Sequence, residues 1–158
     1  MCEQGLYYYG SRFVPADRAL ELYMKGCIIK CEGCQNKELQ EINYLIDKPV
    51  LPDSIVSTLV DYKDVHKRVD IIGGEPTLQS SYYMEILTRL LKENGFKNIV
   101  FFTGRYFNEK QVKSCIYPAW KYCDYVKVGP YIQGDESYIE PLLGLKLASR
   151  NQKVFKVL

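Results

Sequence analysis

The sequence predicts an α/β fold with a parallel sheet, on three observations. Short apolar segments typical of buried strands alternate with amphipathic segments typical of helices along most of the chain. Glycine and proline residues separate the two kinds of segment. The length of 158 residues suits one domain, over residues 1–158, with a substantial core. Strands that are joined by helices pair in parallel through right-handed crossovers, so the expected sheet is parallel.

The first predicted strand covers residues 18–26, where Leu20, Leu22 and Met24 fall on one side with the period of two that strands show. It ends at Gly26, directly before a group of cysteines. Four further strands are predicted over residues 68–72, 98–103, 125–128 and 153–157. The tyrosines at 7–9 are expected to cover an edge of the sheet.

The clearest predicted helix covers residues 80–94 and is followed by Gly95, the residue type that commonly ends helices. Its apolar residues fall on one face, namely Tyr83, Ile86, Leu87, Leu90 and Leu91. Shorter helices are predicted over residues 36–43, 54–62 with Asp53 as its cap, and 109–116.

Four loops are expected to meet at one edge of this sheet. Active sites of such sheets lie at the carboxyl ends of the strands, where loops leave the core. The cysteine group and residues 73–76, 103–105 and 129–131 each follow a predicted strand. The sequence therefore predicts one site built by all four loops.

The composition excludes several classes of function. Apolar residues make up 47% and charged residues 25%, and the formal net charge is +2 with both signs interspersed. No broad electrostatic field would attract nucleic acid or an anionic membrane, so neither is an expected partner. The first residues lack the features of a secretory signal, and no apolar stretch is long enough to cross a bilayer, so we expect a cytoplasmic protein. Six cysteines in that reducing compartment indicate metal binding or redox chemistry.

Three of the six cysteines form a compact ligand set, Cys27, Cys31 and Cys34. Cysteine thiolates hold iron–sulfur clusters, and a four-iron cluster normally takes four of them. Three thiolates leave one iron open. That iron can coordinate the amino and carboxylate groups of S-adenosylmethionine and pass one electron to the neighbouring sulfonium.

A zinc site is the main alternative for these cysteines. Structural zinc takes four tetrahedral ligands, and Cys115 or Cys123 could supply the fourth from elsewhere in the fold. His66 lies in a polar stretch, where we expect it to be exposed and not a ligand. The scattered Cys2, Cys115 and Cys123 are more simply explained as small apolar residues of the core.

The Cx3Cx2C loop after the first strand resembles the signature of the radical S-adenosylmethionine superfamily. The segment Gly73-Gly74-Glu75-Pro76 resembles the superfamily's GGE motif, which holds the amino group of the cofactor's methionine. Within the superfamily, the chain is most similar to the activating proteins of anaerobic ribonucleotide reductases. That likeness is carried by KCEGCQN at 30–36, FFTGR at 101–105, CDYVKVGPY at 123–131 and LASRNQKVF at 147–155. Val128 stands where that family has an aspartate, and Lys127 precedes it.

The resemblance implies an incomplete, open parallel β/α barrel, because a full eight-stranded barrel takes about 250 residues. It implies a [4Fe–4S] cluster on Cys27, Cys31 and Cys34, which cleaves S-adenosylmethionine to methionine and a 5'-deoxyadenosyl radical. It also implies two protein partners: the catalytic subunit of the reductase, whose glycine receives the radical, and a reduced flavodoxin- or ferredoxin-type electron donor.

The resemblance assigns the cofactor contacts residue by residue. The backbone of Gly33, Cys34 and Gln35 faces the adenine, Gly73, Gly74 and Glu75 hold the methionine end, and Thr103 contacts the ribose. Three readings remain open at this point: activation of another glycyl-radical enzyme, a radical reaction on a small molecule, and a zinc-stabilised binding module without catalysis.

Overall fold

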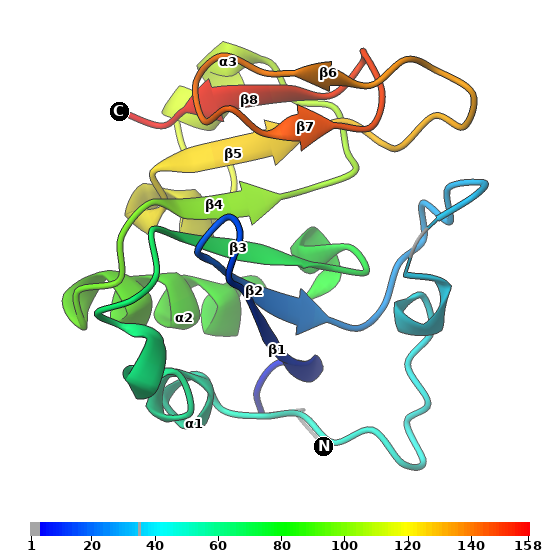
Figure 1. Ribbon diagram of the computed structural model, residues 1–158. Coiled ribbons are helices and arrows are strands. Elements are labelled where there is room, and N and C mark those ends of the chain that lie inside the picture. The colour runs from blue at the N-terminus through cyan, green and yellow to red at the C-terminus, as the bar shows by residue number, and fades with distance from the viewer. Residues whose placement is uncertain (1–3, 35) are drawn as a thin grey trace.

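A six-stranded mixed sheet forms the centre of the molecule (Figure 1). The computed structural model describes residues 4–34 and 36–158. The strand order is β1-β2-β3-β4-β5-β8, and a separate two-stranded sheet pairs β6 with β7. The strands are β1 Tyr8–Val14, β2 Ala19–Met24, β3 Arg68–Gly73, β4 Ile99–Phe102, β5 Tyr125–Val128, β6 Tyr138–Ile139, β7 Lys146–Leu147 and β8 Lys153–Lys156.

The four inner strands β2 to β5 run parallel, and both edge strands run antiparallel to their neighbours. Ile71 of β3 lies beside Leu22 of β2 and Phe101 of β4 in the parallel register. β1 returns to β2 through a tight turn, and β8 pairs with β5 with Val126 opposite Phe155. The chain between β5 and β8 carries the β6–β7 hairpin instead of a crossover helix, so β8 comes back in the opposite direction.

Three α-helices connect the strands: α1 Pro52–Ser57, α2 Ser81–Glu93 and α3 Glu109–Lys113. α2 begins at a hydroxyl cap, since Ser80 Oγ accepts from Tyr83 N. It ends at Gly95, whose φ of +84° is the left-handed conformation that favours glycine. The 3-10 helices are η1 Lys37–Leu39, η2 Val60–Tyr62, η3 Pro76–Leu78 and η4 Pro118–Tyr122.

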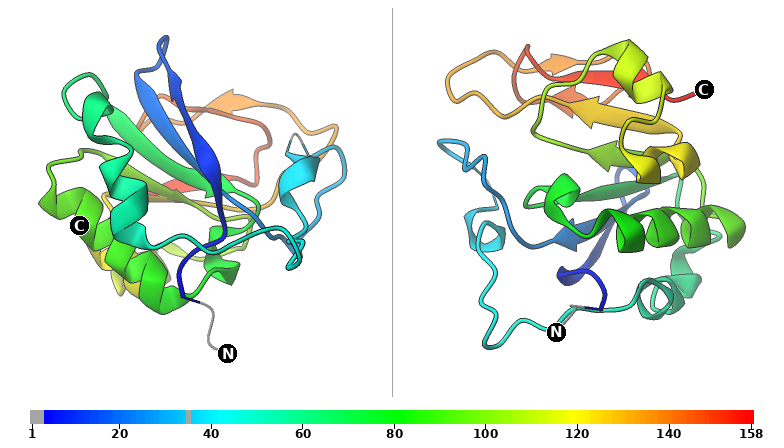
Figure 2. Two further views of the ribbon diagram at one scale, coloured as in Figure 1. Left: turned by 90° about the horizontal axis from the view of Figure 1, so that it is seen from below. Right: turned by 180° about the vertical axis from the view of Figure 1, so that it is seen from behind.

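The two faces of the sheet differ in what covers them. α1 and α2 lie on one side, and the segment after β2 and the β6–β7 hairpin lie toward the other (Figure 2). Strand residues that face the helices are fully buried in one apolar core with α2, among them Leu20, Leu22, Met24, Ile71 and Phe101. The alternate residues face away from the core, and several of them line a cavity. Alternate residues of the inner strands therefore face the core on one side of the sheet and the cavity on the other.

The expected α/β class and the mostly parallel sheet are confirmed. All five predicted strands are present, within one or two residues at each end, as is the helix predicted over 80–94. Tyr8 and Tyr9 belong to the edge strand β1, as expected of the tyrosine run. The open barrel stays an expectation, because the sheet has two free edges and its strand order does not establish a barrel.

Several local predictions were wrong. The last strand pairs antiparallel, and β1, β6 and β7 were not predicted. The helix expected over 54–62 divides into α1 and η2, and α1 starts at Pro52, where proline's missing N–H costs nothing, with Asp53 inside the first turn. The segment 36–43 forms only the short η1 among its described residues. Across the described chain no helix has the length and apolar character needed to cross a membrane.

Candidate functional site

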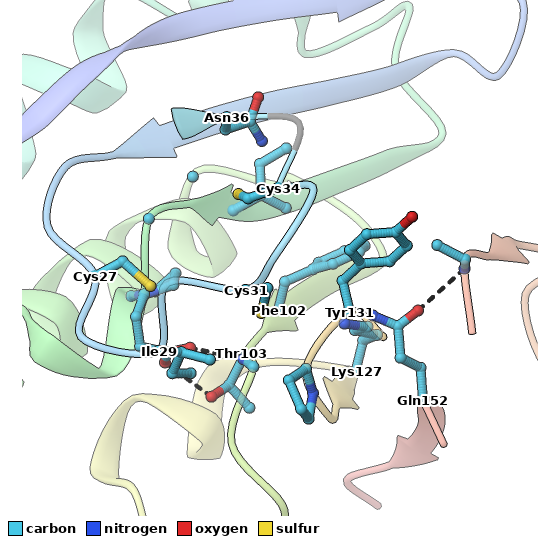
Figure 3. Close-up of a pocket in the computed structure, with 18 of the residues that line it drawn as sticks. Cys27, Ile29, Cys31, Cys34, Asn36, Phe102, Thr103, Lys127, Tyr131 and Gln152 are labelled. Carbon is cyan, nitrogen blue, oxygen red and sulfur yellow. Dashed lines mark hydrogen bonds between the residues drawn. The ribbon is translucent and has the colours of Figure 1, made fainter. Parts of the chain in front are cut away.

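A cavity of about 510 Å³ opens at the carboxyl ends of the parallel strands. All four predicted loops contribute to it, so their expected convergence is confirmed (Figure 3). The predicted site residues that line the cavity are Cys27, Cys31, Cys34, Gly73, Gly74, Glu75 and Thr103. Gly33 lies on the same cysteine loop, and Gln35 and Cys2 lie outside the described residues.

The cysteine loop, residues 25–34, leaves β2 and is anchored at its base by backbone hydrogen bonds. Gly26 N donates to Leu39 O at 2.7 Å and Cys27 N donates to Gln40 O at 2.8 Å. Further along, Cys34 N donates to Cys31 O at 3.1 Å, and Gly33 has a φ of +75°. The loop thus turns back on itself and presents all three half-buried thiols to the cavity.

The three thiols share a cavity without forming a closed metal site. Among the described residues, no three cysteine, histidine or carboxylate side chains lie close enough together to hold a metal ion. Cluster ligation by Cys27, Cys31 and Cys34 therefore stays a prediction. The donor set does fit such a cluster in its chemistry, because cysteine thiolates hold iron–sulfur clusters and the three thiols come from one loop.

Gly73 and Gly74 hold the end of β3 against the cysteine loop. Gly73 has a φ of +121°, and a Cβ there would lie 2.3 Å from Met24 O. A Cβ on Gly74 would lie 2.3 Å from Gly26 O. Glu75 N donates to that same Gly26 oxygen at 2.6 Å. The glycine pair is thus required for backbone to pack on backbone where the two loops meet.

The Glu75 carboxylate connects the ends of β3 and β4. It is 1% exposed and accepts four hydrogen bonds. Oε2 accepts from Thr77 N at 3.1 Å, Thr77 Oγ1 at 2.5 Å and Thr103 Oγ1 at 2.8 Å, and Oε1 accepts from Gly104 N at 2.6 Å. Glu75 lines the cavity where a methionine amino group is expected, and it also fixes the Thr103-Gly104 loop.

Thr103 is oriented by this arrangement. Its hydroxyl donates to Glu75 and accepts from Arg105 N at 3.1 Å, and the residue is buried. Both hydrogen-bonding roles of the hydroxyl are therefore in use within the protein. The ribose contact expected of Thr103 stays a prediction, and a ribose there would have to share the hydroxyl with Glu75 or Arg105.

Lys127 is a cavity residue to which the sequence assigned no role. It lies on β5 and is only 8% exposed. Its Nζ donates to Gly129 O at 2.9 Å and lies 5.9 Å from the centre of the Phe102 ring. Burial lowers the pKa of Lys127 to about 8, against the opposing influence of Glu75 and Cys31. The sequence could have indicated this residue, because it is a lysine within an otherwise apolar strand and the alternation of the strand places it on the same side as the cavity.

The C-terminal segment closes the cavity on the β5 side. Gln152 Oε1 accepts from Ala148 N at 3.0 Å and Ser149 N at 3.3 Å, which holds the turn before β8. Asn151 Nδ2 donates to Pro130 O at 2.8 Å. The Asn-Gln pair of the tail thus ties the end of the chain to the loop after β5.

Charged residues of β1 and β2 line the cavity, and a second ion pair, on β3, lies outside the lining. Arg12 of β1 pairs with Glu21 of β2 at 2.7 Å, and both line the cavity beside Tyr23. On β3, Arg68 pairs with Asp70 at 2.8 Å, and burial raises the pKa of Asp70 to about 6 despite that pairing. The pair of Arg12 and Glu21 was not predicted, because the sequence does not show that β1 and β2 become neighbours.

The remaining candidates of the zinc alternative lie away from the cavity lining. His66 was expected to be exposed, and this was wrong: it is 6% exposed and packs against Phe96. Its Nδ1 bonds to Tyr62 O at 2.9 Å, and its Nε2 accepts from Lys97 N at 2.9 Å, so both ring nitrogens are engaged. Cys123 is a core residue, as predicted, and burial raises its pKa. Cys115 is half-buried against that core.

A family model described as a 4Fe-4S single cluster domain matches residues 12–155, which include the whole cavity lining. The chain belongs to this family. Its metal group is therefore a four-iron cluster, and the zinc module is set aside.

The chain is also similar to the pyruvate formate-lyase-activating enzyme of Staphylococcus epidermidis. The two are 33% identical over 78 residues, which is 47% of this chain and 30% of that enzyme. The chain thus matches less than a third of the length of this curated relative. Together, the family and this relative support an iron–sulfur cluster and S-adenosylmethionine as the two cofactors.

Proposed function

We propose that Cys27, Cys31 and Cys34 hold the cluster and that the chain activates a glycyl-radical enzyme by way of S-adenosylmethionine. The observation that carries the proposal is the set of three thiols on one loop, lining a cavity of about 510 Å³. No fourth cysteine lines that cavity among the described residues. The cluster, when bound, supplies one electron to cleave S-adenosylmethionine, and the resulting 5'-deoxyadenosyl radical removes a hydrogen from a glycine Cα of the partner.

In this proposal the chain's own residues bind and orient the cofactor. Gly73, Gly74 and Glu75 receive the methionine end, and the backbone of Gly33 and Cys34 faces the adenine. The four hydrogen bonds of Glu75 hold its side chain fixed in position where the cationic ammonium of the cofactor is proposed to lie. Thr103 contributes by holding Glu75, with its ribose contact as a further part of the proposal.

The proposed protein substrate is the catalytic subunit of an anaerobic ribonucleotide reductase. The support is the likeness of FFTGR at 101–105 and CDYVKVGPY at 123–131 to the activators of that enzyme. The likeness to a pyruvate formate-lyase-activating enzyme gives the second candidate, a pyruvate formate-lyase. Either substrate requires a reduced flavodoxin- or ferredoxin-type donor. An open barrel with a free edge at β1 would admit a glycine-bearing segment of such a protein.

The experiment offers both candidate enzymes to the reconstituted chain under oxygen-free reducing conditions with S-adenosylmethionine. Electron paramagnetic resonance then follows the glycyl radical, with Cys31→Ala as the matched control. The proposal expects a radical on the reductase and none with the control. A radical on pyruvate formate-lyase alone would change the proposed substrate and still support activase function. Formation of 5'-deoxyadenosine without a radical on either protein would contradict activase function.

A further inference from the structure

Lys127 places a buried positive charge at the proposed cluster site. Among the described residues no carboxylate lies within ion-pairing distance of its Nζ, whose hydrogen bond to Gly129 O leaves further donors unused. The carboxylate that acts on it electrostatically is that of Glu75, which already accepts four hydrogen bonds. A buried charge without a counter-charge is costly, so its retention points to an anionic group that shares the cavity.

The position of Lys127 indicates which group this is. Its side chain reaches into the cavity that the three cysteines line (Figure 3). Cys31 acts electrostatically on the Lys127 ammonium, as Glu75 does. Of the other cationic side chains that line the cavity, Arg12 pairs with Glu21 and Lys146 is exposed to solvent. Lys127 is therefore the buried cation of this lining, and among the described residues no carboxylate forms an ion pair with it.

A four-iron cluster on three thiolates is an anion of the required kind. It carries roughly one net negative charge when oxidised and roughly two when reduced. A fixed positive charge nearby stabilises both states, but it stabilises the more negative, reduced state more. We propose that Lys127 is a positioning residue that raises the reduction potential of the cluster and so favours its reduced form. This inference rests on the proposed function, because it requires the cluster at Cys27, Cys31 and Cys34.

The test measures the reduction potential of the reconstituted cluster in the absence of S-adenosylmethionine. Lys127→Met removes the charge and keeps most of the side chain, Lys127→Arg keeps the charge, and Lys110→Met removes an exposed charge on α3. A unit charge about 10 Å away, at an effective dielectric constant of about 20, changes the ratio of reduced to oxidised cluster about fifteenfold. That is a shift of about 70 mV for a one-electron couple.

We expect the potential of Lys127→Met to be lower by this amount, and those of Lys127→Arg and Lys110→Met to stay near wild type. An unchanged potential in Lys127→Met with normal iron and sulfide overturns the inference. So does a variant that keeps its potential and loses only affinity for S-adenosylmethionine, since Lys127 would then contact that ligand. Should Lys127→Met fail to fold, Lys127→Gln replaces it. If wild type itself takes up no iron and sulfide, the proposed function fails instead.

Discussion

Replacing Glu75 by alanine should destabilise the protein as well as weaken cofactor binding. The substitution deprives four donors of their acceptor: Thr77 N, Thr77 Oγ1, Thr103 Oγ1 and Gly104 N. A hydrogen bond to a charged group contributes about 1.5–3 kcal/mol, and a buried donor without an acceptor costs about 1–3 kcal/mol. Removing the buried charge itself is favourable, and water in the cavity can satisfy some donors. We therefore expect a net loss of about 3–5 kcal/mol in the free energy of unfolding.

Urea denaturation of the cluster-free protein measures this loss, and equilibrium dialysis with S-adenosylmethionine measures binding to the reconstituted protein. Glu140→Ala is the matched control, because Glu140 is 2% exposed and accepts from Leu142 N, Leu143 N and Leu145 N outside the cavity lining. It should lose comparable stability and keep its cofactor affinity. A loss of less than about 1 kcal/mol in the free energy of unfolding of Glu75→Ala would refute the reasoning, since the four hydrogen bonds would then contribute little to the stability of the fold.

Three further predictions concern charges and cysteines. Lys127→Met should stabilise the cluster-free protein by up to about 3 kcal/mol at pH 7, because the pKa of Lys127 in the folded protein, about 8, lies below the usual 10.5. This gain in stability should fade as the pH rises from 8 to 10.5. A variant that calorimetry shows to be less stable than wild type would contradict the prediction. Asp70 has a folded pKa of about 6, raised from 3.8, so its stabilising contribution is complete below pH 3.8 and is lost as the pH rises through 6. Relative to Asp70→Asn, wild type should therefore lose about 3 kcal/mol between about pH 3 and pH 7, and parallel pH profiles in urea titrations would exclude this. Alanine at Cys27, Cys31 or Cys34 should abolish 5'-deoxyadenosine formation, whereas Cys115→Ala should largely keep it; equal loss in all four, by chromatography of the products, would mean that the ligands are wrongly assigned.

The predictable part of the fold was the part with strong periodicity. The inner strands and the helix over 81–93 carry alternating or helical patterns of apolar residues, and burial enforces these patterns. The meeting of the four site loops could be predicted because each loop follows a strand and the carboxyl ends of parallel strands lie at the same edge of the sheet. β1 was missed because it is an edge strand with a mixed pattern of exposure, YYGSRFV, that gives little alternation.

The unpredictable part of the site depends on which segments meet in space. The hydrogen bonds of Glu75 to Thr103 and Gly104 join residues almost thirty positions apart. The exposure of His66 was mispredicted for the same reason. Its ring accepts a hydrogen bond from Lys97 N, which lies about thirty positions away in the sequence. Composition near a residue describes its neighbours in sequence, whereas burial depends on its neighbours in the fold.

The most direct test of the central claim is analysis of iron and acid-labile sulfide after oxygen-free reconstitution, for wild type and for the variant with alanine at Cys27, Cys31 and Cys34. The account predicts about four iron and four sulfide atoms per wild-type chain, an electron paramagnetic resonance signal on reduction that changes when S-adenosylmethionine is added, and neither metal nor signal in the triple variant. A single metal ion without sulfide in wild type, or a normal cluster in the triple variant, would contradict it.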